Sequence, residues 1–481
     1  METLKWEKLL SDRRERASSS QKKNDDSLVA RNAFEADYDR IVGSSSVRRL
    51  QDKAQVFPLQ ENDVARTRLT HSIEVSALAR SLGKAVGIQL ENQKAFTRSQ
   101  TEELAAILQV AGLIHDLGNP PFGHYGEDVI RNWFNKWFDS NPVLGTHNIV
   151  LTEQEQFDFR YFDGNVQNLR IVSKLQTQND IYGANFTFAT LGTIMKYPWR
   201  SNKCPDGNKK FGYFKSEEKL AQEVRSTLGL NENVRHPATY LLEAADDIIY
   251  LCDDIEDGAK KGCINWDREF WEIRTNLEKK NLLTQSLTEL FDSIENKPID
   301  PKMDGRERET ACVRNFRNAV QSFLFKRAIE EFLHRYEDIM SNDYTRVKGL
   351  ELLDCEKGLI KELKRVTAEN CFSCREVLEL ELAGDTVISK LLDIFVKTLI
   401  ESSSEDLSKP KTYAGKIFKL ISSNFTYVAL APYKDANPKF KDQISNLSPY
   451  DRLHLVTDFI SGMTDSYAVD VYQKLTGIKH P

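Results

Sequence analysis

The chain has 481 residues, of which 29% are charged and 40% hydrophobic, and its formal net charge is -6. This composition is ordinary for a globular protein in water, and the small acidic excess argues against general binding to nucleic acid. The most apolar stretch, residues 387–400, still contains three charged side chains, so no segment is expected to cross a membrane. The length permits one to four domains.

The seven cysteines are an odd number and lack the spacing of a disulfide framework. Together with an N-terminus that shows no signal-peptide pattern, they predict a cytoplasmic protein with reduced thiols. Cys371 and Cys374 form one CxxC pair, but no second pair or CxxH sequence completes a zinc site. This pair is therefore only a weak indication of metal binding.

Residues 1–45 form a polar and highly charged N-terminal segment. Its central part reads SDRRERASSSQKKNDDS, a composition typical of a solvated arm. A basic arm that contacts nucleic acid or a neighbouring subunit is the alternative, and the sequence leaves both interpretations open.

The first helix with chemical interest contains RLTHSIEVSALARSLG. Its histidine, His71, shares a helical face with the apolar residues Val75, Leu78 and Leu82. Arg68 precedes His71 by three residues and so lies on roughly the same face, one turn earlier. An inward histidine beside an arginine suits the binding of an anion. We expect this helix to end at Gly87.

A second helix is predicted to begin with a capping box formed by Ser99 and Glu102. Its apolar stripe consists of Leu104, Ile107, Leu108 and Ala111. Extending this stripe by four residues reaches His115, so an imidazole occupies a position where a core side chain is expected. A lone buried histidine is usually a satisfied core residue.

The loop that follows, HDLGNPPFGHYGE, favours a metal centre instead. Asp116 directly follows the histidine, and the run from Gly118 to Pro121 ends the helix. A buried His–Asp pair has to be neutralised or coordinated, because a bare buried carboxylate is very costly. The same rigid loop carries His124 and Glu127, and Glu127 is expected to open the next helix.

A third helix is predicted over residues 236–258, with Pro237 in its first turn and Gly258 at its end. One face is apolar and consists of Leu241, Leu242, Ala245, Ile248, Ile249, Cys252 and Ile255. On the other face, Asp246, Tyr250 and Asp254 follow one another at four-residue spacing and point the same way. An acidic face is usually only solvated, but this one carries too many aspartates for that role alone.

The rest of the chain is expected to be helical, since 3.6-residue periodicity persists and strand signals are scarce. The lysine- and aromatic-rich segment 194–218 is predicted to be a loop or short hairpin that suits phosphate binding. Further helices are expected over 266–291, 313–334, 349–367 and 378–400. A linker is expected at 402–410, and two C-terminal helices should meet at Gly462.

Side chains from three separate helices are able to converge on one divalent cation, namely His71, His115, Asp116 and Asp246. Such ligands suit manganese, magnesium, iron, cobalt or zinc, and the spacing does not choose among them. An incomplete set of protein ligands leaves room for water and substrate, as metal-assisted hydrolysis requires. His124, backed by Glu127, would then pass a proton to a leaving oxygen, which is worth about 10²–10⁴-fold in rate.

This ligand set resembles that of the HD superfamily of metal-dependent phosphohydrolases. The motifs RLTHS, HDLGNPPFGHYGE, LEAADDIIYLCDDIEDG and DFISGMTDSYA are similar, more narrowly, to those of the dGTP triphosphohydrolase family. The resemblance extends from about residue 46 to the C-terminus and implies an all-α fold with at most a minor β-hairpin. We divide the chain into an arm (1–45), an HD catalytic core (46–275), a helical elaboration (276–430) and C-terminal helices packing back on the core (431–481).

The resemblance implies hydrolysis of a dNTP, with dGTP favoured, to a deoxynucleoside and inorganic triphosphate. It carries the metal ligands over to His71, His115, Asp116 and Asp246, with Mn²⁺ or Mg²⁺ as the expected ion, and leaves Asp247 outside the set. The catalytic pair becomes His124 and Glu127. Contacts to the deoxyribose carry over to Gln51, Tyr250 and Asp254. Contacts to the phosphates carry over to Arg68, Asn165, Lys196, Tyr197 and Lys210.

Members of this family form symmetric oligomers, often hexamers, and some respond to dNTPs or single-stranded DNA. A homo-oligomer and such effectors are therefore the expected partners. Two other functions stay open from the residues alone. An HD-type nucleotidase or phosphodiesterase would use the same metal helices with little need for His124. A non-catalytic nucleotide or nucleic-acid sensor would use the basic arm, although no residue of the motif is missing.

Overall fold

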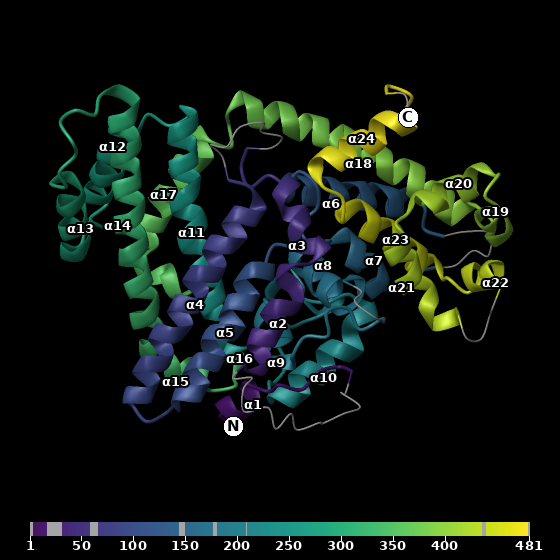
Figure 1. Ribbon diagram of the computed structural model, residues 1–481, viewed down its shortest axis with the longest axis horizontal. Coiled ribbons are helices and arrows are strands. Elements are labelled where there is room, and N and C mark those ends of the chain that lie inside the picture. Colours follow the sequence, from purple (N-terminus) through teal and green to yellow (C-terminus); the bar gives the residue numbers. More distant parts are fainter. Residues whose placement is uncertain are drawn as a thin grey trace. The chain divides into compact units, whose positions relative to one another are not determined.

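The computed structural model describes residues 3–16, 31–57, 66–143, 150–176, 180–207, 209–434 and 439–479. The regular elements in these ranges are helices (Figure 1), so the predicted all-α class is confirmed. Within the same ranges, extended pairing is limited to two isolated β-bridges, Arg14 with Thr187 and Ala54 with Thr67. None of the helices described combines the length and apolarity needed to cross a bilayer. Part of the predicted N-terminal arm, residues 17–30, lies outside the described residues.

The chain folds into two compact units, each assembled from segments that are distant in sequence. Unit 1 contains Met1–Leu10, Ala54–Leu113 and Gly229–Glu379, and unit 2 contains Ser11–Lys53, Ile114–Leu228 and Leu380–Pro481. The division into an arm, a core, an elaboration and C-terminal helices remains a prediction.

The helices of unit 1 are α1 (Trp6–Leu9), α4 (Arg68–Asn92), α5 (Arg98–Ile114), α11 (Pro237–Lys261), α12 (Trp266–Lys279), α13 (Gln285–Glu295), α14 (Gly305–His334), α15 (Tyr336–Ile339), α16 (Tyr344–Val347), η6 (Leu352–Glu356) and α17 (Lys357–Asn370). Helix α11 is central, because it packs against α4, α14 and α17 (Figure 1). The apolar faces predicted for α5 and α11 are buried. The helix predicted over 266–291 is two helices, α12 and α13.

Glycines allow α4 and α5 to pack closely. A methyl group added to Gly112 would lie 2.7 Å from the Cα of Ser76. Gly87 does not end α4, as was predicted, but lies inside it against Thr101, where an added methyl group would lie 2.7 Å from Thr101 Cγ2. Gly87 allows two helices to approach closely and does not end a helix, so α4 continues to Asn92.

The ends of α11 and α5 also differ from the prediction. Helix α11 begins at Pro237, but it runs past Gly258 to Lys261 and is closed by Gly262, whose φ of +79° is the usual left-handed cap. Gly258 is instead a packing position, since a methyl group there would collide with Cys371 Sγ.

Helix α5 begins one residue after Thr97, which forms the capping pair with Gln100. The Thr97 N–H donates to Gln100 Oε1 at 2.9 Å, and the Gln100 N–H donates to Thr97 Oγ1 at 3.3 Å. The predicted pair, Ser99 and Glu102, lies inside the helix. The capping prediction was therefore wrong by two residues.

The helices of unit 2 are α2 (Ala33–Val42), α3 (Ser45–Arg49), η1 (Leu50–Asp52), α6 (Gly123–Ser140), α7 (Glu153–Arg160), α8 (Gly164–Arg170), η2 (Ile171–Leu175), α9 (Phe188–Ile194), η3 (Ser201–Lys203), η4 (Pro205–Gly207), η5 (Lys215–Glu217), α10 (Glu218–Leu228), most of α18 (Arg375–Glu401), α19 (Ser404–Ser408), α20 (Tyr413–Leu420), α21 (Ser423–Lys434), α22 (Phe440–Ser445), α23 (Pro449–Ser461) and α24 (Asp465–Leu475). Segment 194–218 is a loop with short 3₁₀ turns between the end of α9 and the start of α10, and the expected linker at 402–410 contains α19. Helices α23 and α24 meet at Gly462, as predicted.

The described part of the N-terminal segment is packed and paired. In unit 1, Trp6 Nε1 donates to the Tyr336 hydroxyl at 2.8 Å, and the Trp6 ring meets Phe96 edge to face. In unit 2, Arg14 Nη1 lies 2.5 Å from Oδ1 of the fully buried Asp37. These contacts are more specific than those of a solvated arm.

A buried ionic network joins α8 to α23 in unit 2. Arg170 donates from Nε and Nη2 to the two carboxylate oxygens of Asp458, each at 2.7 Å, and from Nη1 to Glu217 Oε1 at 2.8 Å. This bidentate geometry is the strong form of an arginine–carboxylate contact. Helix α8, the loop before α10 and the C-terminal helix α23 are therefore held to one another.

Asp158 lies next to this network, and replacing it by asparagine is expected to flatten the pH dependence of stability. Burial raises the pKa of Asp158 to about 7 against the opposing hydrogen bonds from Lys215, Ser201 and Tyr450. The folded protein therefore binds this proton more tightly than the unfolded chain does. The resulting stability is complete below pH 4 and is lost as the pH rises through 7, an effect of about 4 kcal/mol at most.

The measurement is urea unfolding of both proteins between pH 4 and pH 8. The free energy of unfolding of Asp158→Asn, relative to the unsubstituted protein, should rise across this interval. Asp139→Asn is the matched control, because the Asp139 side chain is 70% exposed and should leave the curve unchanged. Parallel curves for Asp158→Asn and the unsubstituted protein would contradict the prediction.

Candidate metal centre and active site

The antiparallel crossing of α4 and α5 brings two histidines to the same end of the helix pair. Ser76 of α4 contacts Gly112 of α5, and its hydroxyl donates to the Gln109 carbonyl at 2.7 Å. His71 lies five residues before Ser76, and His115 lies three residues after Gly112. Because the helices run in opposite directions, both imidazoles lie on the same side of the crossing.

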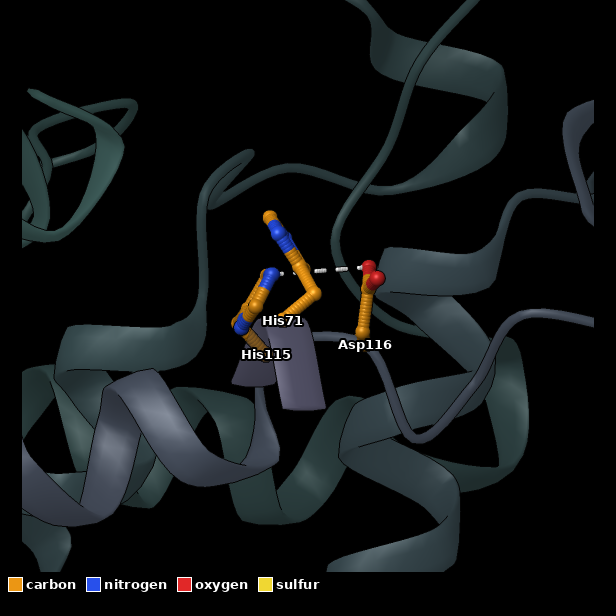
Figure 2. Close-up of side chains that lie close together, drawn as sticks. All are labelled: His71, His115 and Asp116. Carbon is orange, nitrogen blue, oxygen red and sulfur yellow. Dashed lines mark ion pairs between the residues drawn. The ribbon is translucent and has the colours of Figure 1, made fainter. Parts of the chain in front are cut away.

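His71, His115 and Asp116 each offer a ligand atom, and these three atoms lie within 4.8 Å of one another. Figure 2 shows the two imidazoles and the carboxylate close together, with His115 Nε2 3.6 Å from Asp116 Oδ1. Within the described ranges this is the one group of three or more His, Cys, Asp or Glu side chains with such spacing.

Asp246 of α11 approaches the same histidine from within unit 1. Its Oδ1 lies 3.1 Å from His71 Nε2, although Asp246 is not one of the group of three. His71 is 1% exposed and the Asp246 side chain is 34% exposed. The carboxylate therefore stands at the open side of a buried imidazole.

The donor set fits a divalent cation. Ligand atoms that share an ion at about 2.0–2.2 Å lie roughly 3–4.4 Å from one another, which agrees with the 4.8 Å limit around His71, His115 and Asp116. Nitrogen and oxygen donors together suit manganese, iron, cobalt, zinc or magnesium. The residues present are thus able to hold the ion that the sequence predicted.

Gly112→Ala tests whether the helix crossing maintains this geometry. The added methyl group meets backbone atoms of Ser76, so a helix has to move, at a cost of about 1–3 kcal/mol. Mn²⁺ affinity should fall as well, because the movement separates His71 from His115. Gly43→Ala is the control, since nothing lies within 4 Å of its added methyl group. Unchanged unfolding and Mn²⁺ titrations for Gly112→Ala would contradict this prediction.

The loop after α5 is held by polar contacts inside unit 2. Asn119 Nδ2 donates to Asp116 Oδ1 at 2.6 Å, and Asn168 Nδ2 donates to the His115 carbonyl at 3.3 Å. The buried ammonium of Lys53 donates to the Asn119 carbonyl. Gly118 permits the close approach of α8, because a methyl group there would collide with its backbone. These contacts orient Asp116 through its neighbours, as supporting residues of metal ligands do.

His124 lies in the first turn of α6 and Glu127 just after it, and this helix begins at Gly123, four residues earlier than predicted. The His124 side chain is 82% exposed, and its Nδ1 lies 3.6 Å from Oε2 of the buried Glu127. Glu127 is held by the Gly164 N–H, which donates to Oε1 at 2.9 Å, and by Arg131 Nη1, 3.5 Å from Oε2. A fixed carboxylate thus stands beside an accessible imidazole.

The predicted phosphate contacts gather around Tyr197 in unit 2. The ammonium groups of Lys196 and Lys210 each lie 5.8 Å from the centre of its ring. Asp163 caps α8, accepts hydrogen bonds from Asn165, and lies 3.6 Å from Lys210 Nζ. Burial disfavours the charge of Lys210, but Asp163, Tyr197 and Glu127 together outweigh burial and raise the pKa of Lys210. The lysine therefore remains a cation suited to phosphate.

The predicted contacts to the sugar lie mostly on α11. Tyr250 is one turn beyond Asp246, and Lys364 Nζ lies 5.9 Å from its ring centre. Burial, aided by the charges of Asp257 and Asp246, raises the pKa of Asp254 to about 8. A neutral carboxyl group both donates and accepts hydrogen bonds, which suits a hydroxyl ligand.

Two other predicted substrate residues lie near helix starts. Arg68 is the first residue of α4 and is 2% exposed. Gln51 lies in the short turn η1 of unit 2 and is exposed. Their roles stay predictions.

The sequence reasoning missed Lys53, Asn119 and Asp163, which support the loop and the lysine pair. Asn119 lies inside the HDLGNPP motif, and Asp163 precedes a GN turn, so a local sequence pattern could have indicated both residues. No local pattern indicated Lys53, because its contacts with the Asn119 and Ser461 carbonyls join distant parts of the chain.

An all-helical chain with a histidine on one helix and a His–Asp pair at the end of the next is an HD-domain protein, and the HD domain family matches residues 68–155. A phosphohydrolase-associated domain matches residues 408–474. The chain is 41% identical to a deoxyguanosinetriphosphate triphosphohydrolase-like protein of Listeria monocytogenes, over 99% of this chain and all of the relative. It is 31% identical to a deoxyguanosinetriphosphate triphosphohydrolase of Klebsiella pneumoniae, over 93% of this chain and 94% of the relative.

A deoxyguanosinetriphosphate triphosphohydrolase-like protein of Synechocystis is 33% identical over 99% of this chain and all of the relative. The chain therefore belongs to the dGTP triphosphohydrolase family of the HD superfamily. It is a hydrolase that contains an HD domain.

Proposed function

We propose that the protein hydrolyses dGTP, and other dNTPs besides, to the deoxynucleoside and inorganic triphosphate. The observation that carries this proposal is the group formed by His71, His115 and Asp116, whose ligand atoms lie within 4.8 Å of one another. The name of the Klebsiella pneumoniae relative supports the choice of substrate. Assembly into a homo-oligomer, a response to dNTPs or single-stranded DNA, and a cytoplasmic location remain predictions from the resemblance.

In this proposal His71, His115, Asp116 and Asp246 hold a divalent cation, with Mn²⁺ or Mg²⁺ preferred. When bound, the cation supplies Lewis-acid polarisation of the α-phosphoryl group and of the attacking water. Water then attacks the α-phosphorus, the bond to the 5′-oxygen breaks, and that oxygen takes up a proton. The products are the deoxynucleoside and triphosphate, so one water is consumed for each dNTP.

His124 is the proposed donor of that proton. Its imidazole projects from the first turn of α6 and lies beside the fixed carboxylate of Glu127, 3.6 Å away. A general acid in this position lowers the barrier to departure of the 5′-oxygen. The cationic Lys210 and Arg68 supply counter-charge for the phosphates.

The proposed sugar contacts lie on α11. Asp254 and Tyr250 follow Asp246 at four-residue intervals, so a deoxyribose beside the cation would lie along this face. Together with Gln51, they are proposed to recognise the 3′-hydroxyl and exclude a 2′-hydroxyl.

The test is a product assay with metal-depleted protein, to which Mn²⁺ or Mg²⁺ is added with each of the four dNTPs or with GTP. We expect triphosphate from dGTP and little turnover of GTP. In ¹⁸O-labelled water the label should appear in triphosphate and not in the deoxynucleoside. Pyrophosphate or orthophosphate as the first product would reject the proposed reaction. Hydrolysis of bis(p-nitrophenyl) phosphate without dNTP turnover would favour a phosphodiesterase.

A further inference from the structure

The acidic end of α11 carries more buried charge than the proposed site uses. Asp253, Glu256 and Asp257 are each at most 4% exposed, and none belongs to the proposed ligand or substrate set. Burying carboxylates is costly unless cations and hydrogen-bond donors compensate. The compensating groups are chiefly two arginines, Arg66 just before α4 and Arg317 on α14.

Arg66 contacts four carboxylates. Its Nη1 lies 2.6 Å from Asp257 Oδ1, its Nη2 2.9 Å from Glu256 Oε2, and its Nε 3.1 Å from Asp253 Oδ2 and 2.9 Å from Glu74 Oε2. The Arg66 backbone N–H also donates to Asp257 Oδ2 at 3.0 Å. Both the main chain and the side chain of Arg66 are therefore fastened to α11.

Arg317 adds a second connection to the same cluster. Its Nε lies 2.5 Å from Asp253 Oδ1 and 3.3 Å from Glu256 Oε2, and its Nη2 lies 3.1 Å from Glu74 Oε1. Because Glu74 belongs to α4, the cluster joins α4, α11 and α14. Burial, together with a hydrogen bond to Glu74, raises the pKa of Asp253.

The cluster lies where α4 begins, next to the proposed metal ligands. Thr67 caps α4 directly after Arg66, and His71 follows one turn later. On α11, Asp246 lies seven residues before Asp253, about 10 Å along the helix axis. A displacement of the Arg66 contact with α11 would therefore change the 3.1 Å separation of His71 Nε2 and Asp246 Oδ1.

An apolar cluster of equal volume would stabilise the fold about as well, since buried ion pairs often add little net stability. An arginine differs from apolar side chains because the N–H donors of its planar guanidinium group fix the geometry of its partners. We propose that Arg66 is a positioning residue that sets the spacing between His71 and Asp246 and thereby the affinity for the divalent cation. The inference rests on the proposed function, because it requires these two side chains to bind the same ion.

The test is calorimetric titration of the full chain with Mn²⁺. Arg66→Met retains much of the side-chain volume but removes the charge, and we expect the affinity to fall at least about tenfold. Asp257→Asn removes one ion pair while keeping an acceptor for the Arg66 N–H, so the affinity should fall less. Arg66→Lys should recover part of the lost affinity, because it restores the charge but not the planar guanidinium donors.

Arg365→Met is the matched control for a simple loss of stability. Arg365 also contacts four carboxylates, those of Glu269, Glu272, Glu362 and Glu369. Its replacement should lower Tm to an extent similar to Arg66→Met and leave Mn²⁺ affinity unchanged. Equal losses of affinity in the two variants would overturn the inference.

The remaining outcomes separate this inference from the proposed function. Failure of the unsubstituted protein to bind Mn²⁺ would overturn the proposed metal site, and this inference with it. Unchanged affinity in Arg66→Met, beside normal binding by the unsubstituted protein, would overturn the inference alone. If Arg66→Met does not fold, the Asp257→Asn variant becomes the test. Unchanged Mn²⁺ affinity in that variant would then overturn the inference.

Discussion

Replacing Asp246 by alanine is expected to weaken Mn²⁺ binding by at least about a hundredfold while the helical fold is retained. The carboxylate lies 3.1 Å from His71 Nε2, and its removal takes one anionic donor from the proposed site. The fold should tolerate the change, because the Asp246 side chain is 34% exposed and alanine favours a helix interior. Calorimetric titration measures the affinity, and circular dichroism measures the helix content.

Asp247→Ala is the control for this prediction, since Asp247 occupies the next position on the same helix and is only partly buried. It removes an equal charge and leaves the proposed ligand in place, so its Mn²⁺ affinity should stay near that of the unsubstituted protein. Full metal occupancy in Asp246→Ala would show that Asp246 is not a ligand. An equal loss in both variants would indicate a general electrostatic effect.

Replacing His124 by alanine should lower kcat for dGTP by about 10²–10⁴-fold and leave Mn²⁺ affinity unchanged. The imidazole is 82% exposed, so its removal should cost little stability. The expected defect is confined to proton donation, because His124 lies on α6 and outside the group of His71, His115 and Asp116. Steady-state kinetics with saturating Mn²⁺ measures the effect.

Glu127→Gln provides a second measure of the same pair. Glutamine keeps an acceptor for the Gly164 N–H, which Glu127 binds at 2.9 Å, but loses the negative charge beside His124. The kcat for dGTP should therefore fall in Glu127→Gln, by less than in His124→Ala. Lys136→Ala, on the exposed face of the same helix, is the control. Near-normal kcat in His124→Ala would favour the phosphodiesterase alternative.

Local sequence patterns predicted the presence of the helices better than the residues at which they end. The apolar faces of α5 and α11 are buried as expected, because side-chain periodicity is a property of the segment itself. Gly87 and Gly258 were read as helix ends but lie inside helices. A glycine that permits helix packing and a glycine that ends a helix look alike until the neighbouring element is known.

The sequence by itself determined the all-α class, the family and the side chains able to perform metal chemistry, since these depend on residue type and on spacing within one helix. Only the tertiary structure decided that His71, His115 and Asp116 meet, that Asp246 stands beside His71, and that Arg66 is held by α11. These distances depend on the contact of Gly112 with Ser76 and on an ion cluster completed by Arg317. Such contacts join residues far apart in the chain, and no local pattern encodes them.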